Sequence, residues 1–245
     1  MPTSLVGGVT IGFGSAAALG LAAGAFAYAS RWPASQIFGR TLIAPTRPGE
    51  LALTFDDGPN PACTPRLLDI LAERGVKATF FLVGQFAEQE SALARSIANA
   101  GHAVGNHSWS HPDLSLSETH RVREELARTK ETLEQITGKR VHLFRPPFGA
   151  RRPRVLRIAR ELEMVPVMWN VMTSDWSTPD PDRIVRKLAK KIEANQLSGF
   201  ASNIVLHDGG HLALNIDRGP SIAAAGKLLE RYVQSHKFVT VDGWV

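Results

Sequence analysis

The sequence predicts an α/β domain with a parallel sheet, either a closed barrel or an open doubly wound sheet. From about residue 48 onward, short apolar runs alternate with longer amphipathic stretches, a pattern typical of repeated β-α units. The 245 residues are 44% hydrophobic and 21% charged, which indicates a globular chain long enough for one sizeable core. Polar residues follow the apolar runs directly, where parallel α/β barrels build their active sites.

The apolar runs predict seven strands, at residues 51–55, 78–83, 103–106, 141–144, 165–169, 203–206 and 238–241. Six helices are predicted between them, at residues 64–75, 88–100, 117–137, 153–163, 180–195 and 220–234. Proline opens several of these helices, and glycine follows the end of others, as expected from their backbone preferences. The sequence contains no internal repeat.

The first thirty residues differ from the rest of the chain. No residue from Leu5 to Ala29 is charged, and at a rise of ~1.5 Å per residue this stretch could cross a ~30 Å hydrocarbon core. We interpret residues 1–30 as a membrane anchor or a signal segment, and therefore expect a membrane-associated or exported protein. Residues 31–47 contain several prolines and are interpreted as a linker or an irregular entry segment.

The anchor and signal interpretations rest on different observations. Ala27-Tyr28-Ala29 resembles the small-residue site at which signal peptides are cleaved. No Lys or Arg precedes the apolar stretch, however, and Arg31, Arg40 and Arg47 follow it. By the positive-inside rule this order keeps the folded domain of an anchored protein cytoplasmic. A third alternative is a helix packed against a partner.

Charge and cysteine content limit the possible functions. The net charge of +5 suits an anionic polymer, an anionic membrane surface or simply a basic protein surface. Lys and Arg are spread along the chain without a cluster that alternates with aromatic residues, so no nucleic-acid partner is expected. Cys63 is the single cysteine, so any bound metal must use His, Asp or Glu ligands.

Two motifs contain residue types that bind metals. Asp56 and Asp57 end the first apolar strand, and adjacent carboxylates repel one another unless a cation or another partner compensates their charge. His107 and His111 are four residues apart, so both imidazoles can meet on one side of a turn. A histidine pair joined to a carboxylate makes a His₂Asp ligand set with positions left for water. Taken alone, the first motif is equally an ordinary Asp-Gly turn.

Five motifs in order make the chain similar to the polysaccharide deacetylases, carbohydrate esterase family four, which contain the NodB homology domain. These motifs are Thr54 to Pro59, His107 to His111, Arg145 to Gly149, Asp175-Trp176 and Leu206 to Asp208. The resemblance covers about residues 48–245 and implies a distorted (β/α) barrel of about seven parallel strands. It also implies a hydrolase that removes N-acetyl groups from amino sugars of a polysaccharide or glycolipid, such as peptidoglycan, a chitin-like oligomer or a lipid-linked sugar.

The resemblance implies a role for each matching residue. Asp57, His107 and His111 would bind a divalent metal, with zinc expected first and cobalt, nickel or manganese as alternatives. Asp56 would be the general base and His207 the general acid, which Asp175 orients, while Arg145 acts electrostatically on Asp56. A rim salt bridge is the alternative for Arg145 and Asp175. The residues expected at the oxyanion or substrate are Pro147, Phe148, Trp109, Trp176 and Leu206.

One position departs from the family pattern. Met172 stands where the family has a second Asp, four residues before the Trp of the fourth motif, so a polar partner of Arg145 is expected to be missing. This departure motivates a second hypothesis, a metal-dependent deformylase, amidase or esterase that acts on another acyl group. A third hypothesis is a non-catalytic, membrane-tethered glycan-binding protein. His102 is expected to be a packed histidine, and His211 a loop histidine that could touch substrate.

Overall fold

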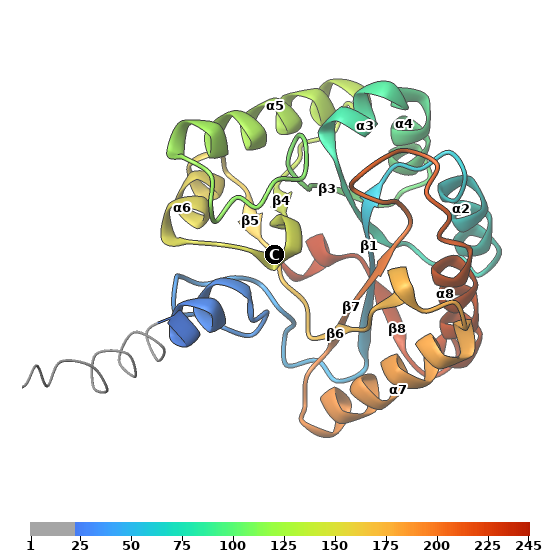
Figure 1. The fold of residues 1–245 in the computed structure, drawn as a ribbon. Helices are drawn as coiled ribbons and strands as arrows, with labels where there is room; N and C mark the ends of the chain where they lie inside the picture. Colours follow the sequence, from blue (N-terminus) through green and yellow to red (C-terminus); the bar gives the residue numbers. More distant parts are fainter. Residues whose placement is uncertain (1–22) are drawn as a thin grey trace, which may run out of the picture.

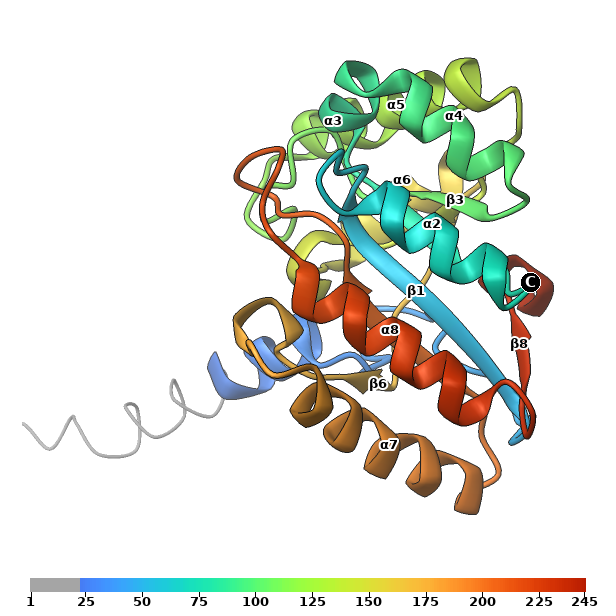
Figure 2. The same cartoon turned by 90° about the vertical axis from the view of Figure 1, so that its right-hand side faces the viewer.

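The computed structural model describes residues 23–245. Most of the predicted anchor or signal segment, residues 1–22, lies outside this range. The α/β class is confirmed: a curved sheet of parallel strands carries its helices around the outside (Figure 1, Figure 2). Among the described residues, no helix combines the length and hydropathy needed to cross a bilayer.

The sheet contains eight strands, which pair in the order β5-β4-β3-β2-β1-β7-β6, with β8 beside β1. The strands are β1 (Glu50–Gly58), β2 (Thr79–Leu82), β3 (Ala103–Asn106), β4 (Leu143–Phe144), β5 (Val165–Pro166), β6 (Val171–Met172), β7 (Ser202–His207) and β8 (Lys237–Val239). Because β5 and β6 end the sheet without pairing to each other, the barrel is incomplete. The predicted strand 165–169 is shorter than expected, and the sequence did not predict β6.

Seven α-helices and three short 3₁₀ turns follow the strands in the part of the chain from β1 onward. The helices are α2 (Thr64–Glu73), α3 (Gly84–Gln89), α4 (Ser91–Asn99), α5 (Thr119–Thr137), α6 (Pro153–Glu161), α7 (Pro181–Leu197) and α8 (Gly219–Tyr232). The 3₁₀ turns are η1 (Pro147–Gly149), η2 (Asp175–Ser177) and η3 (Val241–Trp244). The prediction of one helix at 88–100 was wrong, because non-helical dihedral angles at Glu90 separate α3 from α4.

Strand β1 is buried on both faces, and its alternation determines which side chains reach the inside of the barrel. Leu51, Leu53 and Phe55 pack into the main core against helices α2, α7 and α8. Ala52 faces the opposite way and packs in a cluster with Phe81 of β2. Since successive side chains of a strand point to opposite faces, Thr54 and Asp56 share the inner face with Ala52.

The segment before β1 is attached to the sheet along its backbone. Leu42 forms an isolated parallel bridge with Val167. The Leu42 N–H donates to Pro166 O at 2.8 Å, and Asn203 Nδ2 donates to Ile43 O at 3.0 Å. This arrangement agrees with an irregular entry segment and differs from a free linker.

Candidate active site

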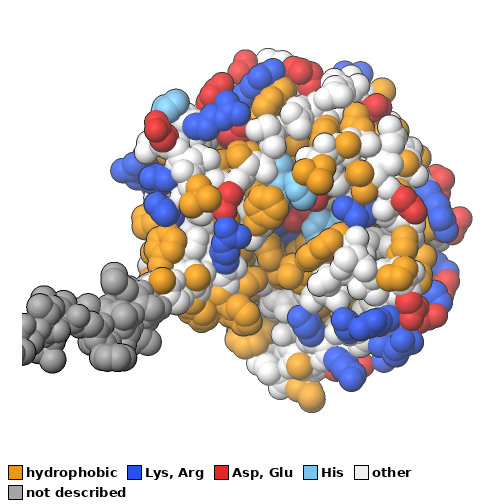
Figure 3. Space-filling model, in the orientation of Figure 1, with side chains coloured by type: hydrophobic (Ala, Val, Ile, Leu, Met, Phe, Trp, Pro, Cys, Tyr) orange, Lys and Arg blue, Asp and Glu red, His pale blue; other side chains and the backbone are white. Residues whose placement is uncertain are grey.

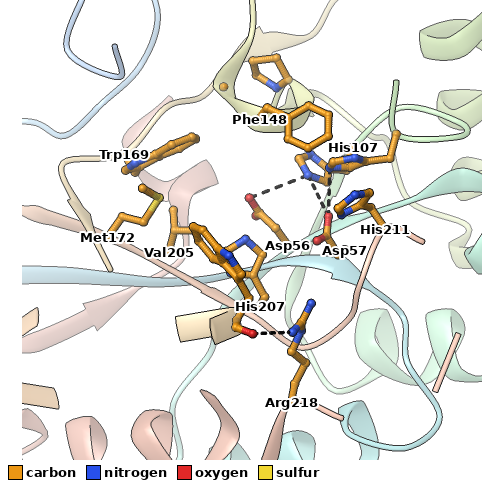
Figure 4. A pocket seen from close by; sticks show the side chains of 14 residues that line it. Asp56, Asp57, His107, Phe148, Trp169, Met172, Val205, His207, His211 and Arg218 are labelled. Atoms are coloured by element: carbon orange, nitrogen blue, oxygen red, sulfur yellow. Dashed lines mark hydrogen bonds and ion pairs between the residues drawn. The ribbon is translucent and has the colours of Figure 1, made fainter. Parts of the chain in front are cut away.

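A cleft of about 330 Å³ opens at the carboxyl ends of the strands, within the range of small-molecule sites. Figure 3 shows histidine and acidic side chains at the bottom of a hollow that hydrophobic side chains surround. The cleft is lined by Asp56, Asp57, His107, His111, Pro146, Phe148, Gly149, Trp169, Met172, Trp176, Val205, His207, His211 and Arg218 (Figure 4). Parallel β-α units therefore bring residues of all five sequence motifs into one place.

Asp57, His107 and His111 converge at the end of β1, and Figure 4 shows His107 directed toward Asp57. His107 Nε2 lies 3.4 Å from Asp57 Oδ1, and His111 Nε2 lies 3.2 Å from the same oxygen. Ligand atoms held at about 2.0–2.1 Å by a tetrahedral ion are separated by roughly 3.3 Å. The three residues therefore match the donor types and the spacing of a divalent metal site.

The protonation and pairing of these ligands also suit a metal. His107 Nδ1 donates to Arg145 O at 2.8 Å, which directs Nε2 toward Asp57. Burial lowers the pKa of His111. Burial disfavours the Asp57 carboxylate, but the neighbouring His107 and His111 hold the Asp57 pKa well below its usual value. Within residues 23–245, buried Asp57 Oδ1 has no hydrogen bond of ordinary geometry, so a cation would supply the partner that this oxygen lacks.

The turn that carries the two histidines is held by a buried carboxylate from α5. Glu125, which is fully buried, accepts hydrogen bonds from the backbone N–H groups of Trp109 and Ser110, both at 2.8 Å. Arg121 compensates its charge at 2.7 Å. The sequence did not single out Glu125, because its position in a charged helix has no local signal for an inward contact.

Trp109 does not lie in the cleft, where it was predicted to contact a sugar. Its side chain is 9% exposed, and the Arg128 guanidinium lies over its ring at 3.5 Å from the centroid. The ring also packs so closely on Gly84 that a Cβ there would lie 2.6 Å from it. Trp109 thus joins α3 to the histidine turn and does not line the cleft.

Asp56 is held by Arg145 on the inner face of the barrel. Arg145 is fully buried, and its Nη1 donates to Asp56 Oδ1 and to Thr54 Oγ1, both at 2.7 Å. Asn203 Oδ1 accepts from Arg145 Nη2 at 3.3 Å, while Arg145 Nε has no partner. Asn203 thus supplies a polar contact to Arg145 although Met172 supplies none.

His207 faces the same cleft and is bound by Asp175 of η2. His207 Nδ1 and its backbone N–H each lie 2.9 Å from an Asp175 oxygen, and Ser221 Oγ donates to the same carboxylate at 2.7 Å. Burial disfavours the imidazolium, but the charge and hydrogen bond of Asp175, with smaller contributions from Asp57 and Asp56, raise the pKa of His207 to about 9. This arrangement can hold a proton on His207 at neutral pH.

The turn η1 presents Phe148 to the cleft. Phe148 has φ 56°, its side chain is 48% exposed, and its ring lies edge-on to His111 at 4.6 Å. Two of the residues predicted to contact substrate are buried, so those predictions were wrong. Pro147 and Leu206 point into the protein and do not line the cleft, whereas Pro146 and Val205, one residue earlier in each motif, do. Trp176 lines it as predicted and is 46% exposed.

Two polar cleft residues come from the loop between β7 and α8. The His211 ring stacks on His111 at 4.6 Å with an interplanar angle of 24°. Arg218 donates to Gly209 O at 2.7 Å and to Trp176 O at 3.2 Å. His211 was expected to be a loop histidine that could touch substrate, and Arg218 was not predicted to be in the site. Only the position of His211, four residues after His207, was a signal for its place in the site.

The opposite wall of the cleft is apolar. Trp169, Met172 and Val205 line it and pack in one cluster. Trp169 was not among the residues predicted for the site. Met172 therefore occupies the site's wall with a thioether where the family pattern has a carboxylate.

Comparison with known proteins agrees with this geometry. The sequence model of the polysaccharide deacetylase family matches residues 44–167, which contain β1 to β5 and the first three motifs. The chain belongs to the polysaccharide deacetylase family.

Two relatives illustrate the range of this family. The chain is 38% identical over 183 residues to a peptidoglycan-N-acetylglucosamine deacetylase of Bacillus cereus, covering 74% of this chain and 64% of the relative. It is 40% identical over 162 residues to a chitooligosaccharide deacetylase of Rhizobium leguminosarum bv. phaseoli, covering 65% of this chain and 68% of that protein. The chain thus spans just under two thirds of the length of the first relative.

Two solved structures share the fold. A peptidoglycan N-acetylglucosamine deacetylase superposes with a TM-score of 0.71 and 33% identity, covering 83% of this chain and 91% of its own. A family pseudoenzyme from Bacillus anthracis also superposes with a TM-score of 0.71, at 27% identity, covering 83% of this chain and 68% of its own. The fold is therefore shared by a deacetylase and a pseudoenzyme, so the activity of this chain depends on its own site residues.

Proposed function

We propose that this protein is a metal-dependent hydrolase that removes N-acetyl groups from the amino sugars of a glycan. The observation that carries the proposal is the meeting of Asp57, His107 and His111 in one cleft with Asp56 and His207. Hydrolysis of an amide needs a base for water and an acid for the leaving amine. Both are available here beside the metal ligands.

Asp57, His107 and His111 would hold the cation, for which zinc is our first proposal because two imidazoles and one carboxylate suit it. A divalent cation at this place would lower the pKa of water and polarise the acyl carbonyl. Cobalt, nickel and manganese accept similar ligands and are the alternatives.

The chain's own residues would move the protons. Arg145 donates a hydrogen bond to Asp56 Oδ1, so Asp56 Oδ2 would accept the proton from the attacking water. His207 Nδ1 is bound to Asp175, so a proton on Nε2 would be the one given to the leaving amine. This proton transfer is needed because an unprotonated amide nitrogen is a poor leaving group.

Stabilisation of the oxyanion would come partly from the η1 turn. Phe148 has a left-handed backbone conformation, and its ring contacts His111. We therefore propose that the Phe148 backbone N–H donates a hydrogen bond to the acyl oxygen. Phe148 and Trp176 are half-exposed aromatic side chains in the cleft. We propose that these rings contact the sugar.

The glycan is proposed from the relatives. Peptidoglycan and chitooligosaccharides are named in two of them, and both present N-acetylated amino sugars. A glycolipid is a third possibility.

We also propose that residues 1–30 attach the protein to a membrane without being cleaved. Residues 23–31 form one helix across the candidate cleavage site, and Ala29 and Ser30 are only 3% and 2% exposed. The mass of the chain purified from its host tests cleavage, and a topology reporter at the C-terminus tests the side of the membrane. A mature chain that begins at Ser30 would contradict the anchor.

One observation favours a second candidate function. Met172 makes the cleft wall apolar beside Trp169 and Val205, which would suit an acyl group other than acetyl. The alternative is thus a metal-dependent deformylase, amidase or esterase, for which the substrate panel must include formyl, acetyl and longer acyl groups.

The test is release of acyl groups from chitooligosaccharides, peptidoglycan fragments and acylated amino sugars by the zinc-loaded protein. We expect acetate release that a chelator abolishes. Asp56→Asn should lower kcat at least ~100-fold because the general base is lost. Asp69→Asn, an exposed carboxylate on α2, should leave kcat unchanged.

Absence of turnover on the whole panel would reject the enzymatic proposal. If the wild type shows no turnover while it and Asp56→Asn bind a glycan equally well, the non-catalytic hypothesis would be favoured instead.

A further inference from the structure

Arg151 is a buried cation whose partners are all backbone carbonyls. Its side chain is 0% exposed, and no carboxylate within residues 23–245 forms an ion pair with it. Burial accordingly lowers its pKa. Such a charge is costly unless polar groups compensate it, so the carbonyls around it must be held in place.

Three of these carbonyls belong to the last turn of the N-terminal helix and to the segment that follows it. Arg151 Nη2 donates to Trp32 O at 2.6 Å and to Ser35 O at 2.8 Å. Its Nη1 lies 3.3 Å from Ser30 O, and its backbone N–H donates to the same oxygen at 3.0 Å. Carbonyls at the C-terminal end of a helix carry partial negative charge, which suits a guanidinium.

The fourth carbonyl belongs to the candidate oxyanion turn. Arg151 Nη1 donates to Gly149 O at 2.9 Å. Phe148 and Gly149 have φ 56° and 64°, and a left-handed φ is unfavourable for a phenylalanine without support from its surroundings. A Cβ at Gly149 would lie 2.9 Å from Trp169, so the turn contacts both that ring and Arg151.

We propose that Arg151 is a positioning residue, which fixes the Phe148 turn by bracing it against residues 30–35. The inference rests on the proposed function, because it assigns the turn to the oxyanion. The entry segment would then belong to the catalytic architecture as well as joining the N-terminal stretch to the domain. The Arg31–Asp113 ion pair also holds this segment. The Arg152 guanidinium lies 4.7 Å from the ring of Phe26, in the helix that precedes the segment.

The experiment compares two arginines near the start of α6 in the full-length, zinc-loaded protein. Arg151→Gln should lower kcat ~10–100-fold with KM and zinc content nearly unchanged, and Arg151→Lys should recover part of the loss because it keeps the charge. The matched control is Arg154→Gln. Arg154 also donates to two carbonyls, Ser115 O and Ser117 O, but does not contact η1, so its loss should lower Tm and leave kcat near the wild-type value.

A readout that needs no turnover separates this proposal from the enzymatic one. The Gly149 and Ala150 N–H groups donate to Pro146 O and Pro147 O, both at 2.9 Å, so amide hydrogen exchange reports whether the turn is intact. Arg151→Gln should speed exchange at residues 147–151 and 30–36, whereas Arg154→Gln should not. Unchanged exchange there, or a kcat loss that Arg154→Gln reproduces, would overturn the proposal even in an active enzyme. Faster exchange in a protein without turnover would support the brace and reject only the catalytic assignment.

Discussion

His207 depends on one carboxylate for its charge. Its side chain is only 14% exposed, so burial alone would favour the neutral imidazole. Asp175 provides both the nearest charge and the hydrogen bond to Nδ1, which raise the pKa of His207 to about 9. A cation bound by Asp57 would cancel part of the increase that Asp57 makes to the pKa of His207. Asp175 would then be the main group that stabilises the protonated imidazole.

Asp175→Asn should therefore shift the alkaline limb of the activity profile. A general acid is active while it is protonated, so wild-type kcat/KM should fall as the pH rises through about 9. Without the Asp175 charge the pKa of His207 falls, and the limb should move to lower pH, with at least ~10-fold less activity at pH 8. Profiles of kcat/KM against pH measure this, with Asp217→Asn on the neighbouring loop as the control. An unmoved limb would mean that another group is the acid.

At the scale of elements, the site depends on the close approach of two strand ends. A Cβ at Gly209, just beyond β7, would lie 2.0 Å from the Asp57 carbonyl oxygen and 2.9 Å from Gly58 N. Real Cβ atoms do not approach backbone this closely. The backbone that carries the candidate metal ligand Asp57 is therefore in contact with the loop that carries His211 and Arg218.

Gly209→Ala should separate the two strand ends and displace Asp57. We expect zinc affinity to fall at least ~10-fold, since ligand geometry controls binding, together with a lower Tm. Gly226→Ala in α8 is the matched change, because the nearest atom to a Cβ there is 3.7 Å away and alanine favours helix over glycine. Competition with a chromogenic chelator measures the affinity. Equal affinity in both variants would show that the strand ends can separate without harm to the site.

At the scale of the whole molecule, a metal would connect parts of the barrel that are far apart in sequence. Asp57 comes from β1, whereas His107 and His111 follow β3, and about fifty residues separate them. The unfolded chain does not hold these ligands together, so binding stabilises the folded state by mass action.

Zinc at ~1,000 times its Kd should add about 4 kcal/mol to the free energy of unfolding. For a domain of this size that corresponds to a Tm increase of roughly 10 °C, which a chelator should reverse. His111→Ala should abolish most of the increase, and His120→Ala, an exposed histidine, should keep it. Calorimetric scans with and without zinc measure this. A wild-type Tm that is independent of zinc would argue against a metal at this place.

The parts of the fold with strong local signals were predictable. Strand β1 is a continuous apolar run that ends in two carboxylates, and α5 ends at Gly138, which has φ 65°. The start of α3 at Gly84 had no such signal. There, Gly84 and Gln85 donate to Ser108 O and Trp109 O, contacts between segments that are distant in the chain.

The sequence by itself determined the residue types that meet at the metal, the two acid-base candidates and the β-α order that brings them to one edge of a sheet. Spacing and alternation are local, so they can be read along the chain. The tertiary structure alone decided that Leu206 and Trp109 turn away from the cleft, that His211 and Arg218 enter it, and that Glu125 and Arg151 support its turns. These placements depend on which faces of distant elements pack together, and a buried polar side chain finds its partners only when those faces have met.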